Sequence, residues 1–146
     1  MYKSILLPTD GSEFAAKGVE AGLALAAALG AKVDLLVVTE AIPTYAGLDG
    51  AAFAVTYADF DKVQAETAAK VLAAAKARAD AAGVAAATHH VSRSQPAEAI
   101  LATAKARGSD LVVMASHGHR GVRRLFLGSQ TAEVLAHAAI PVLVIP

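Results

Sequence analysis

The sequence predicts an α/β fold in which helices cover both faces of a five-stranded parallel sheet of strand order 3-2-1-4-5. Short apolar, β-branched runs alternate with longer segments of helical periodicity, so that five strands are separated by four helices. The run KVDLLVV at 32–38 hardly alternates between polar and apolar residues, as is typical of a strand covered on both faces. This order of elements favours one parallel sheet joined by right-handed crossovers.

The five expected strands are short and are bounded by turn-forming or charged residues. They are Lys3–Thr9, Lys32–Val38, Ala85–Val91, Asp110–Ala115 and Pro141–Ile145. The third has little apolar content, which places it at a sheet edge. The last is also expected at an edge, where Pro141 and Pro146 limit its length.

Apolar residues recur every three or four positions in four segments, which predicts four helices. These are Glu13–Leu29, Phe60–Ala82, Pro96–Arg107 and Ser129–Ala138. Ser12 is the expected N-cap of the first helix, and Ser94 or Gln95 that of the third. The core-facing row of the first helix is expected to be Phe14, Gly18, Gly22, Leu25 and Leu29. That of the second is expected to be Phe60, Val63, Thr67, Val71, Ala74 and Arg78.

The segment Thr39–Asp59 carries Pro43, Gly47 and Gly50 and three of the few aromatic residues. It is expected to form a long loop, with a turn of helix as an option. Loops of this length are uncommon in compact domains and are often functional.

Length and composition predict one cytoplasmic domain over residues 1–146. Thirteen basic and thirteen acidic residues cancel, which argues against nucleic acid as the main partner. The absence of cysteine excludes disulfides, thiolate catalysis and Cys-type zinc sites. No apolar stretch approaches the eighteen residues of a membrane span, and the start of the chain does not resemble a signal peptide.

Polar residues gather where the first, second and fourth strands end. These are Asp10-Gly11-Ser12, Val38-Thr39-Glu40 and the stretch from Ser116 to Ser129. In a sheet of this order the first and fourth strands flank the switch point, where ligands bind. We therefore expect a ligand site at the carboxyl ends of these strands.

The stretch from Ser116 to Ser129 has the residues of a phosphate cradle. Gly118, Gly121 and Gly128 allow close backbone approach, and Ser129 begins a helix whose N–H groups favour an anion. A flexible loop followed by an ordinary serine cap explains the same residues. The lysine of a Walker loop is absent. Arg120, Arg123 and Arg124 either clamp phosphate or are simply solvated.

Asp10 either contacts a ligand, through a base amino group or a ribose hydroxyl, or forms a cap or Asx-turn at the first helix. His117 and His119 lie in the glycine-rich loop, where either is close enough in sequence to touch a phosphate. His89 and His90 are adjacent on a strand and point to opposite faces, so they do not form a shared metal site.

The chain resembles the universal stress protein family over its whole length. ILLPTDGSEFA, PAEAILATAKARGSDLVVMASHG and LGSQTAEVLAHAAIPVLVIP carry the resemblance. It implies a five-stranded parallel sheet and a homodimer formed through the last strand, Pro141–Pro146. In the ATP-binding branch the pattern is G-x2-G-x9-G-[ST].

On this sequence the pattern places its last two residues at Gly128 and Ser129 and its middle glycine at Gly118. The first glycine falls on Ala115, a departure that adds a methyl group where backbone approaches the ligand. The resemblance also implies a base contact for Asp10 and an adenine contact for Val38 or its neighbour.

The resemblance thus implies a dimeric stress-response sensor or regulator that binds ATP or AMP, with cyclic AMP as a further candidate and Mg²⁺ as an optional companion. Its regulatory protein partner is unknown, and no membrane or nucleic acid is expected. The alternatives are a nucleotide-free dimerisation module and a slow ATPase with no assignable base. The implied nucleotide-binding residues are Pro8, Thr9, Asp10, Val38, Thr39, Met114, Ala115, His117, Gly118, His119, Arg120, Gly128, Ser129, Gln130 and Thr131.

Overall fold

The computed structural model describes residues 1–42, 50–118 and 126–146, with the side chains of 50–56 left out of the description. Its elements follow the predicted order. They are β1 (Ser4–Pro8), α1 (Glu13–Leu29), β2 (Lys32–Val38), α2 (Gly50–Ala81), β3 (Ala86–Val91), α3 (Pro96–Arg107), β4 (Leu111–Ala115), α4 (Ser129–His137) and β5 (Val142–Ile145). No helix in the described ranges is long and apolar enough to cross a membrane.

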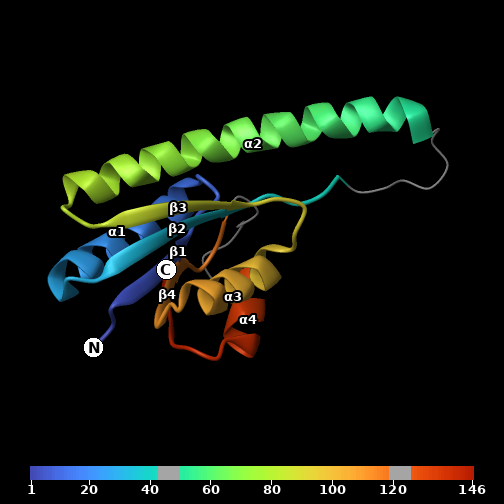
Figure 1. The fold of residues 1–146 in the computed structure, drawn as a ribbon. Helices are drawn as coiled ribbons and strands as arrows, with labels where there is room; N and C mark the ends of the chain where they lie inside the picture. The colour runs from blue at the N-terminus through green and yellow to red at the C-terminus, as the bar shows by residue number, and fades with distance from the viewer. Residues whose placement is uncertain (43–49, 119–125) are drawn as a thin grey trace.

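The five strands form one parallel sheet in the order β3-β2-β1-β4-β5 (Figure 1). The predicted fold class and strand order are therefore confirmed. β3 and β5 lie at the two edges, as their sequences predict. Strand ends differ from the expected ones by a single residue where they differ at all.

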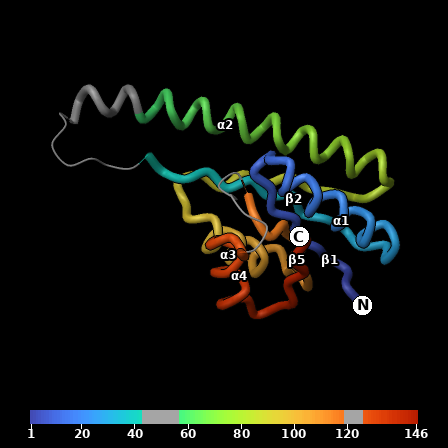
Figure 2. Tube along the Cα trace, turned by 180° about the vertical axis from the view of Figure 1, so that it is seen from behind, coloured from blue at the N-terminus to red at the C-terminus, as the bar shows by residue number. Residues whose placement is uncertain are grey.

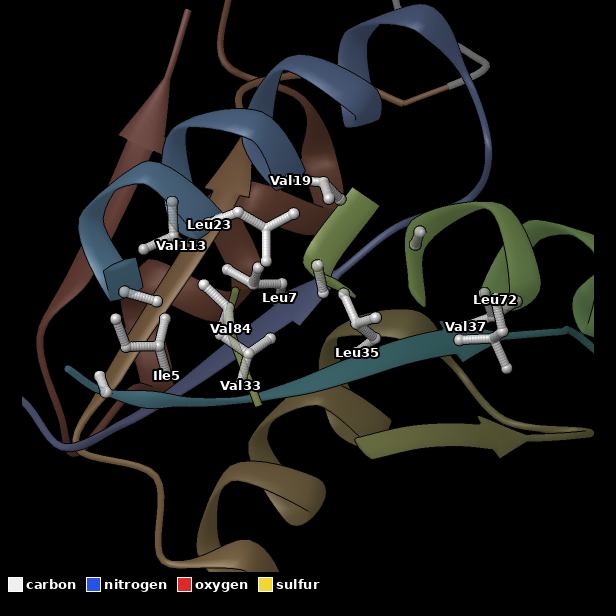
Figure 3. Close-up of a cluster of buried hydrophobic side chains, with 14 of the residues drawn as sticks. Ile5, Leu7, Val19, Leu23, Val33, Leu35, Val37, Leu72, Val84 and Val113 are labelled. Atoms are coloured by element: carbon white, nitrogen blue, oxygen red, sulfur yellow. The ribbon is translucent and has the colours of Figure 1, made fainter. Parts of the chain in front are cut away.

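Helices cover both faces of the sheet, as Figures 1 and 2 show. α1 and α2 bury one cluster of side chains, which includes Ile5, Leu7 and Leu35 (Figure 3). α3 and α4 bury a second cluster on the opposite face, which includes Leu6, Leu36 and Val112. Alternate residues of one strand thus enter different cores, which explains the continuous apolar runs of the central strands.

Two glycines bring α1 close to the sheet. A Cβ added at Gly18 would lie 2.8 Å from the backbone N of Ala115, and one at Gly22 would overlap the side chain of Leu7. The predicted row on α1 was right at these two positions and wrong at Phe14, which is 40% exposed. The buried residues of α1 are Ala15, Gly18, Val19, Gly22, Leu23 and Ala26. The packed face of this helix thus combines four small residues with Val19 and Leu23.

α2 corrects two predictions. It begins at Gly50 rather than Phe60, so the second half of the expected loop is helical; its alanines have high helix propensity. The buried positions are Ala68, Leu72, Ala75 and Ala79, one residue beyond the predicted row, and Val63 is 59% exposed. The predicted row followed the larger side chains, whereas three of the four buried positions of α2 are alanines. In Figure 1 the first turns of α2 extend past the sheet.

A buried carboxylate lies on the α3 face of the sheet. Asp34 in β2 is 2% exposed, and its Oδ1 accepts hydrogen bonds from Nε2 of His89 at 2.6 Å and from Nε of Arg107 at 3.1 Å. His90 bonds instead to the hydroxyl of Thr39 at 2.8 Å. The adjacent histidines thus have separate partners, as expected for opposite sides of a strand.

Asp110 joins the start of β4 to the start of β1. Its carboxylate accepts hydrogen bonds from the backbone N–H groups of Lys3 at 2.8 Å and Ser4 at 3.1 Å. Burial opposes ionisation of this carboxyl. The N–H groups of Lys3, Ser4 and Asp110 itself and the positive N-terminus outweigh it and hold the pKa of Asp110 below its ordinary value.

The lowered pKa of Asp110 predicts a pH-dependent contribution to stability. The ionised group binds the native N–H groups, so its contribution is complete above the unfolded pKa of about 4 and is lost as pH falls through the lower folded pKa. We expect Asp110→Asn to reduce the free energy of unfolding by about 1 kcal/mol at pH 7. Urea unfolding at pH 7, 5 and 3 measures this difference, which should shrink at the lowest pH. A difference that stays constant would contradict the assignment.

Candidate functional site

A cavity of about 460 Å³ opens at the carboxyl ends of β1, β2 and β4, within the usual size range of small-molecule sites. The structure brings thirteen of the residues predicted for the site to its walls. They are Pro8, Thr9, Asp10, Val38, Thr39, Met114, Ala115, His117, Gly118, Gly128, Ser129, Gln130 and Thr131. His119 and Arg120, with Gly121, Arg123 and Arg124, lie outside the described residues.

The turn after β1 holds Asp10 at the cavity. Gly11 has φ +82°, a conformation that L side chains rarely adopt. Oδ1 of Asp10 accepts the N–H of Ser12 at 2.9 Å, which forms the Asx-turn that was one of the two sequence interpretations. Ser12 in turn accepts the N–H of Ala15 at 3.1 Å and caps α1. Asp10 is thus placed by the turn and still lines the cavity.

The two glycines of the pattern are in tight surroundings. A Cβ at Gly118 would overlap Oδ2 of Asp10, so the loop after β4 passes directly against that carboxylate. A Cβ at Gly128 would lie 2.7 Å from the backbone oxygen of Ser116, which already accepts the N–H of Gly128 at 2.8 Å. Gly128 therefore requires glycine for the observed approach of α4 to the backbone after β4, whereas a side chain at Gly118 would displace the carboxylate of Asp10.

α4 begins without a side-chain cap. Its N-cap is Gly128, whereas α1 is capped by Ser12. In α3, Pro96 has no N–H, and the N–H of Ala97 donates to Oε1 of Gln130 at 3.0 Å. Of these three helices, only α4 has no side-chain oxygen on its first-turn N–H groups among the described residues. These groups point where the helix dipole is positive, so this wall suits an anion.

Several predicted site residues use their side chains within the protein. The hydroxyl of Thr9 accepts the N–H of Gly11 at 3.2 Å. Thr131 donates its hydroxyl to the backbone oxygen of Ala115 at 3.0 Å, and Thr39 bonds to His90. By contrast, the hydroxyl of Ser129 has no partner among the described residues. The threonines thus position the walls, and Ser129 is left for a ligand.

The charged groups in the cavity walls are unevenly distributed. Asp10 and Glu40 contribute carboxylates, which can accept hydrogen bonds from hydroxyl or amino groups. Among the described wall residues, His117 has the one side chain that can become positive. No cluster of three metal-ligating side chains occurs in the described ranges. A ligand with donors at one end and an anionic group at the other therefore matches this arrangement.

α2 contributes a wall that the sequence interpretation missed. Gln64, Thr67, Ala68 and Val71 line the cavity at helical spacing, and an ion pair between Asp61 and Arg93 joins α2 to the turn after β3. Thr67 and Val71 belong to the row of α2 that was expected to face the core. That row was the one sequence feature that could have indicated this wall. The other unpredicted wall residues are Ala15, Leu36, Val37, Pro96 and Ile100, and Glu40 lines the cavity as its place after the second strand suggested.

Comparison with known proteins finds the same architecture elsewhere. The family model described as "Universal stress protein family" matches residues 1–146. The "Universal stress protein in QAH/OAS sulfhydrylase 3'region" of Thermus aquaticus is 37% identical over 99% of this chain and 99% of its own length.

Two solved structures are similar over nearly the whole chain. Protein MJ0577 superimposes with a TM-score of 0.84 at 28% identity, covering 99% of this chain and 96% of its own. A universal stress protein solved in complex with cAMP has a TM-score of 0.68 at 25% identity, with the same two coverages. With a family model that matches every residue and a relative 37% identical over the full length, the chain belongs to the universal stress protein family.

Proposed function

We propose that this chain binds an adenine nucleotide, AMP or ATP, at the carboxyl ends of β1 and β4 and acts in the cytoplasm as a dimeric sensor or regulator. The observation that carries the proposal is the uncapped N-terminus of α4 in the wall of the cavity. A phosphate group would satisfy its N–H groups and interact favourably with the helix dipole.

The opposite part of the cavity suits the nucleoside. The carboxylate of Asp10 is placed to accept from a ribose hydroxyl or a base amino group, and the half-buried Val38 offers an apolar surface to a base. The cAMP-bound relative supports an adenine ligand for this fold. Ala115 lines the cavity where the family pattern has glycine, and this observation favours the alternative of a nucleotide-free module.

Isothermal titration of the purified chain distinguishes nucleotide binding from the nucleotide-free module. We expect AMP, ATP and cyclic AMP to bind, with adenosine and inorganic phosphate each much weaker because they occupy one part of the cavity. Heat-denatured protein should also release co-purified nucleotide into the supernatant. No binding at millimolar nucleotide, together with an empty supernatant, would contradict the proposal and support the nucleotide-free module.

The proposed dimer uses β5. This strand has a partner, β4, on one side only, and its Leu143 is 42% exposed. A second copy of the same edge would pair the open backbone groups and cover this side chain.

Leu143→Arg is therefore expected to convert the dimer to a monomer, because it places two like charges at the two-fold interface. Light scattering after size-exclusion chromatography measures the mass. Leu135→Ala, which changes a side chain of equal exposure on α4, should remain dimeric. A dimeric Leu143→Arg variant would contradict the β5 interface.

A further inference from the structure

Phe14 is a large apolar side chain whose position the core does not explain. It lies in the first turn of α1 and is 40% exposed, whereas the buried face of that helix starts at Ala15. Its ring lies against the imidazole of His117, with the ring centroids 6.4 Å apart and the planes tilted by 57°. This is a favourable arrangement for two aromatic rings. Phe14 thus supports a cavity residue from outside the cavity wall.

Two contacts fix the His117 ring. Its Nδ1 bonds to the hydroxyl of Ser116 at 3.0 Å, and Phe14 packs against the ring. The other nitrogen, Nε2, has no hydrogen-bond partner among the described residues. Because His117 lines the cavity, Nε2 is the ring nitrogen left for a ligand.

His117 lies beside the start of α4, where the proposed function places an anionic group. The described cavity walls contain the carboxylates of Asp10 and Glu40 and no lysine or arginine. The nearest cation on α1 is Lys17, whose Nζ lies 5.9 Å from the centre of the Phe14 ring. A Cβ added at Gly128, the N-cap of α4, would lie 3.5 Å from the Cα of His117. A phosphate at the start of α4 would therefore lie beside His117, whose ring orientation is set by Phe14 and Ser116.

We propose that Phe14 is a positioning residue that holds His117 so that Nε2 donates to the ligand's phosphate. The proposal rests on the proposed function and deepens it, because it assigns a positioning residue to the same site. An imidazole N–H that donates to an ionised phosphate forms a charge-assisted hydrogen bond.

The test measures Kd for AMP and for adenosine at pH 7 in the wild type and in His117→Gln. The wild type should bind AMP about tenfold more tightly than His117→Gln, the strength of one charge-assisted hydrogen bond. Adenosine should bind both proteins equally.

Phe14→Ala should bind AMP with the affinity of His117→Gln, and combining the two substitutions should add no further loss. Phe14→Tyr retains a ring and should restore the wild-type affinity for AMP. Lys17→Ala removes the cation but leaves the ring, so it should also behave as wild type. Equal melting temperatures of these variants would exclude unfolding as the cause.

Proton NMR of the ligand-free protein gives an independent readout. The Hε1 resonance of His117 should move in Phe14→Ala, because the ring current of Phe14 is lost, and should stay in place in Leu135→Ala. A Phe14→Ala variant with the wild-type resonance and AMP affinity would overturn this inference alone. A wild type that binds no nucleotide would overturn the proposed function and this inference with it.

Discussion

The double variant His89→Ala/Arg107→Ala is expected to lose about 3–5 kcal/mol of unfolding free energy at pH 7. Asp34 is 2% exposed, whereas its two partners are far more accessible, with 24% of the His89 side chain and 45% of the Arg107 side chain exposed. Removing both partners leaves the buried carboxylate of Asp34 without a hydrogen-bond donor. An unpartnered buried charge destabilises the native state more than an unpartnered side chain that water can reach. Urea unfolding monitored by circular dichroism measures the loss.

The control adds Asp34→Val to the same background. Valine suits a buried strand position and removes the charge, so the triple variant should regain most of the lost stability. Each single variant, His89→Ala or Arg107→Ala, should lose less than the double, because one hydrogen-bond donor remains. A double variant as stable as wild type, or a triple variant no better than the double, would contradict the role of this buried ion pair.

Gly128→Val is expected to weaken nucleotide binding by at least about a hundredfold, because several ligand contacts at the start of α4 depend on this position. A Cβ there would lie 2.7 Å from the backbone oxygen of Ser116. Backbone cannot yield as a flexible side chain can, so the start of α4 must move away from the loop after β4. Isothermal titration with AMP measures the loss.

Gly30→Ala is the matched control for this prediction. Gly30 ends α1 with φ +64° and has open space around its Cα, so alanine there should cost about 1 kcal/mol of stability and leave AMP affinity unchanged. Retained AMP affinity in Gly128→Val would remove the start of α4 from the proposed site.

The fold could be predicted because each strand and helix carries a local signal. The bounds of α1, β2 and α3 match the predicted ones, where Gly30 and Gly108 end their helices in the left-handed conformation. The start of α2 was wrong because glycine and aromatic residues suggested a loop in an alanine-rich stretch. The α1 row missed Val19 and Leu23, and the α2 row was displaced by one residue because small alanines at 68, 75 and 79 join Leu72 in the buried face.

The candidate site was only partly predictable for a different reason. Residues that follow strands β1, β2 and β4 meet at one edge of the sheet by topology alone, so Asp10, Val38 and Gly118 could be grouped from the sequence. The α2 wall depends on how a long helix crosses those strand ends, which no local pattern encodes. Likewise, the bonds from His89 and Arg107 to Asp34 follow from strand register and helix placement.

The central claim, that the open N–H groups of α4 bind the phosphate of an adenine nucleotide, is tested most directly by Ser129→Pro. Proline suits the first position of a helix, and the φ of −60° and ψ of 147° at Gly128 suit the residue before proline. The variant should keep its helix and lose one N–H and one hydroxyl. Ser129→Ala loses the hydroxyl alone.

Isothermal titration should show AMP binding weakened at least about tenfold more in Ser129→Pro than in Ser129→Ala, with adenosine binding equal in the two. Equal AMP affinity in both variants, at equal melting temperature, would contradict the claim that the backbone at the start of α4 holds the phosphate.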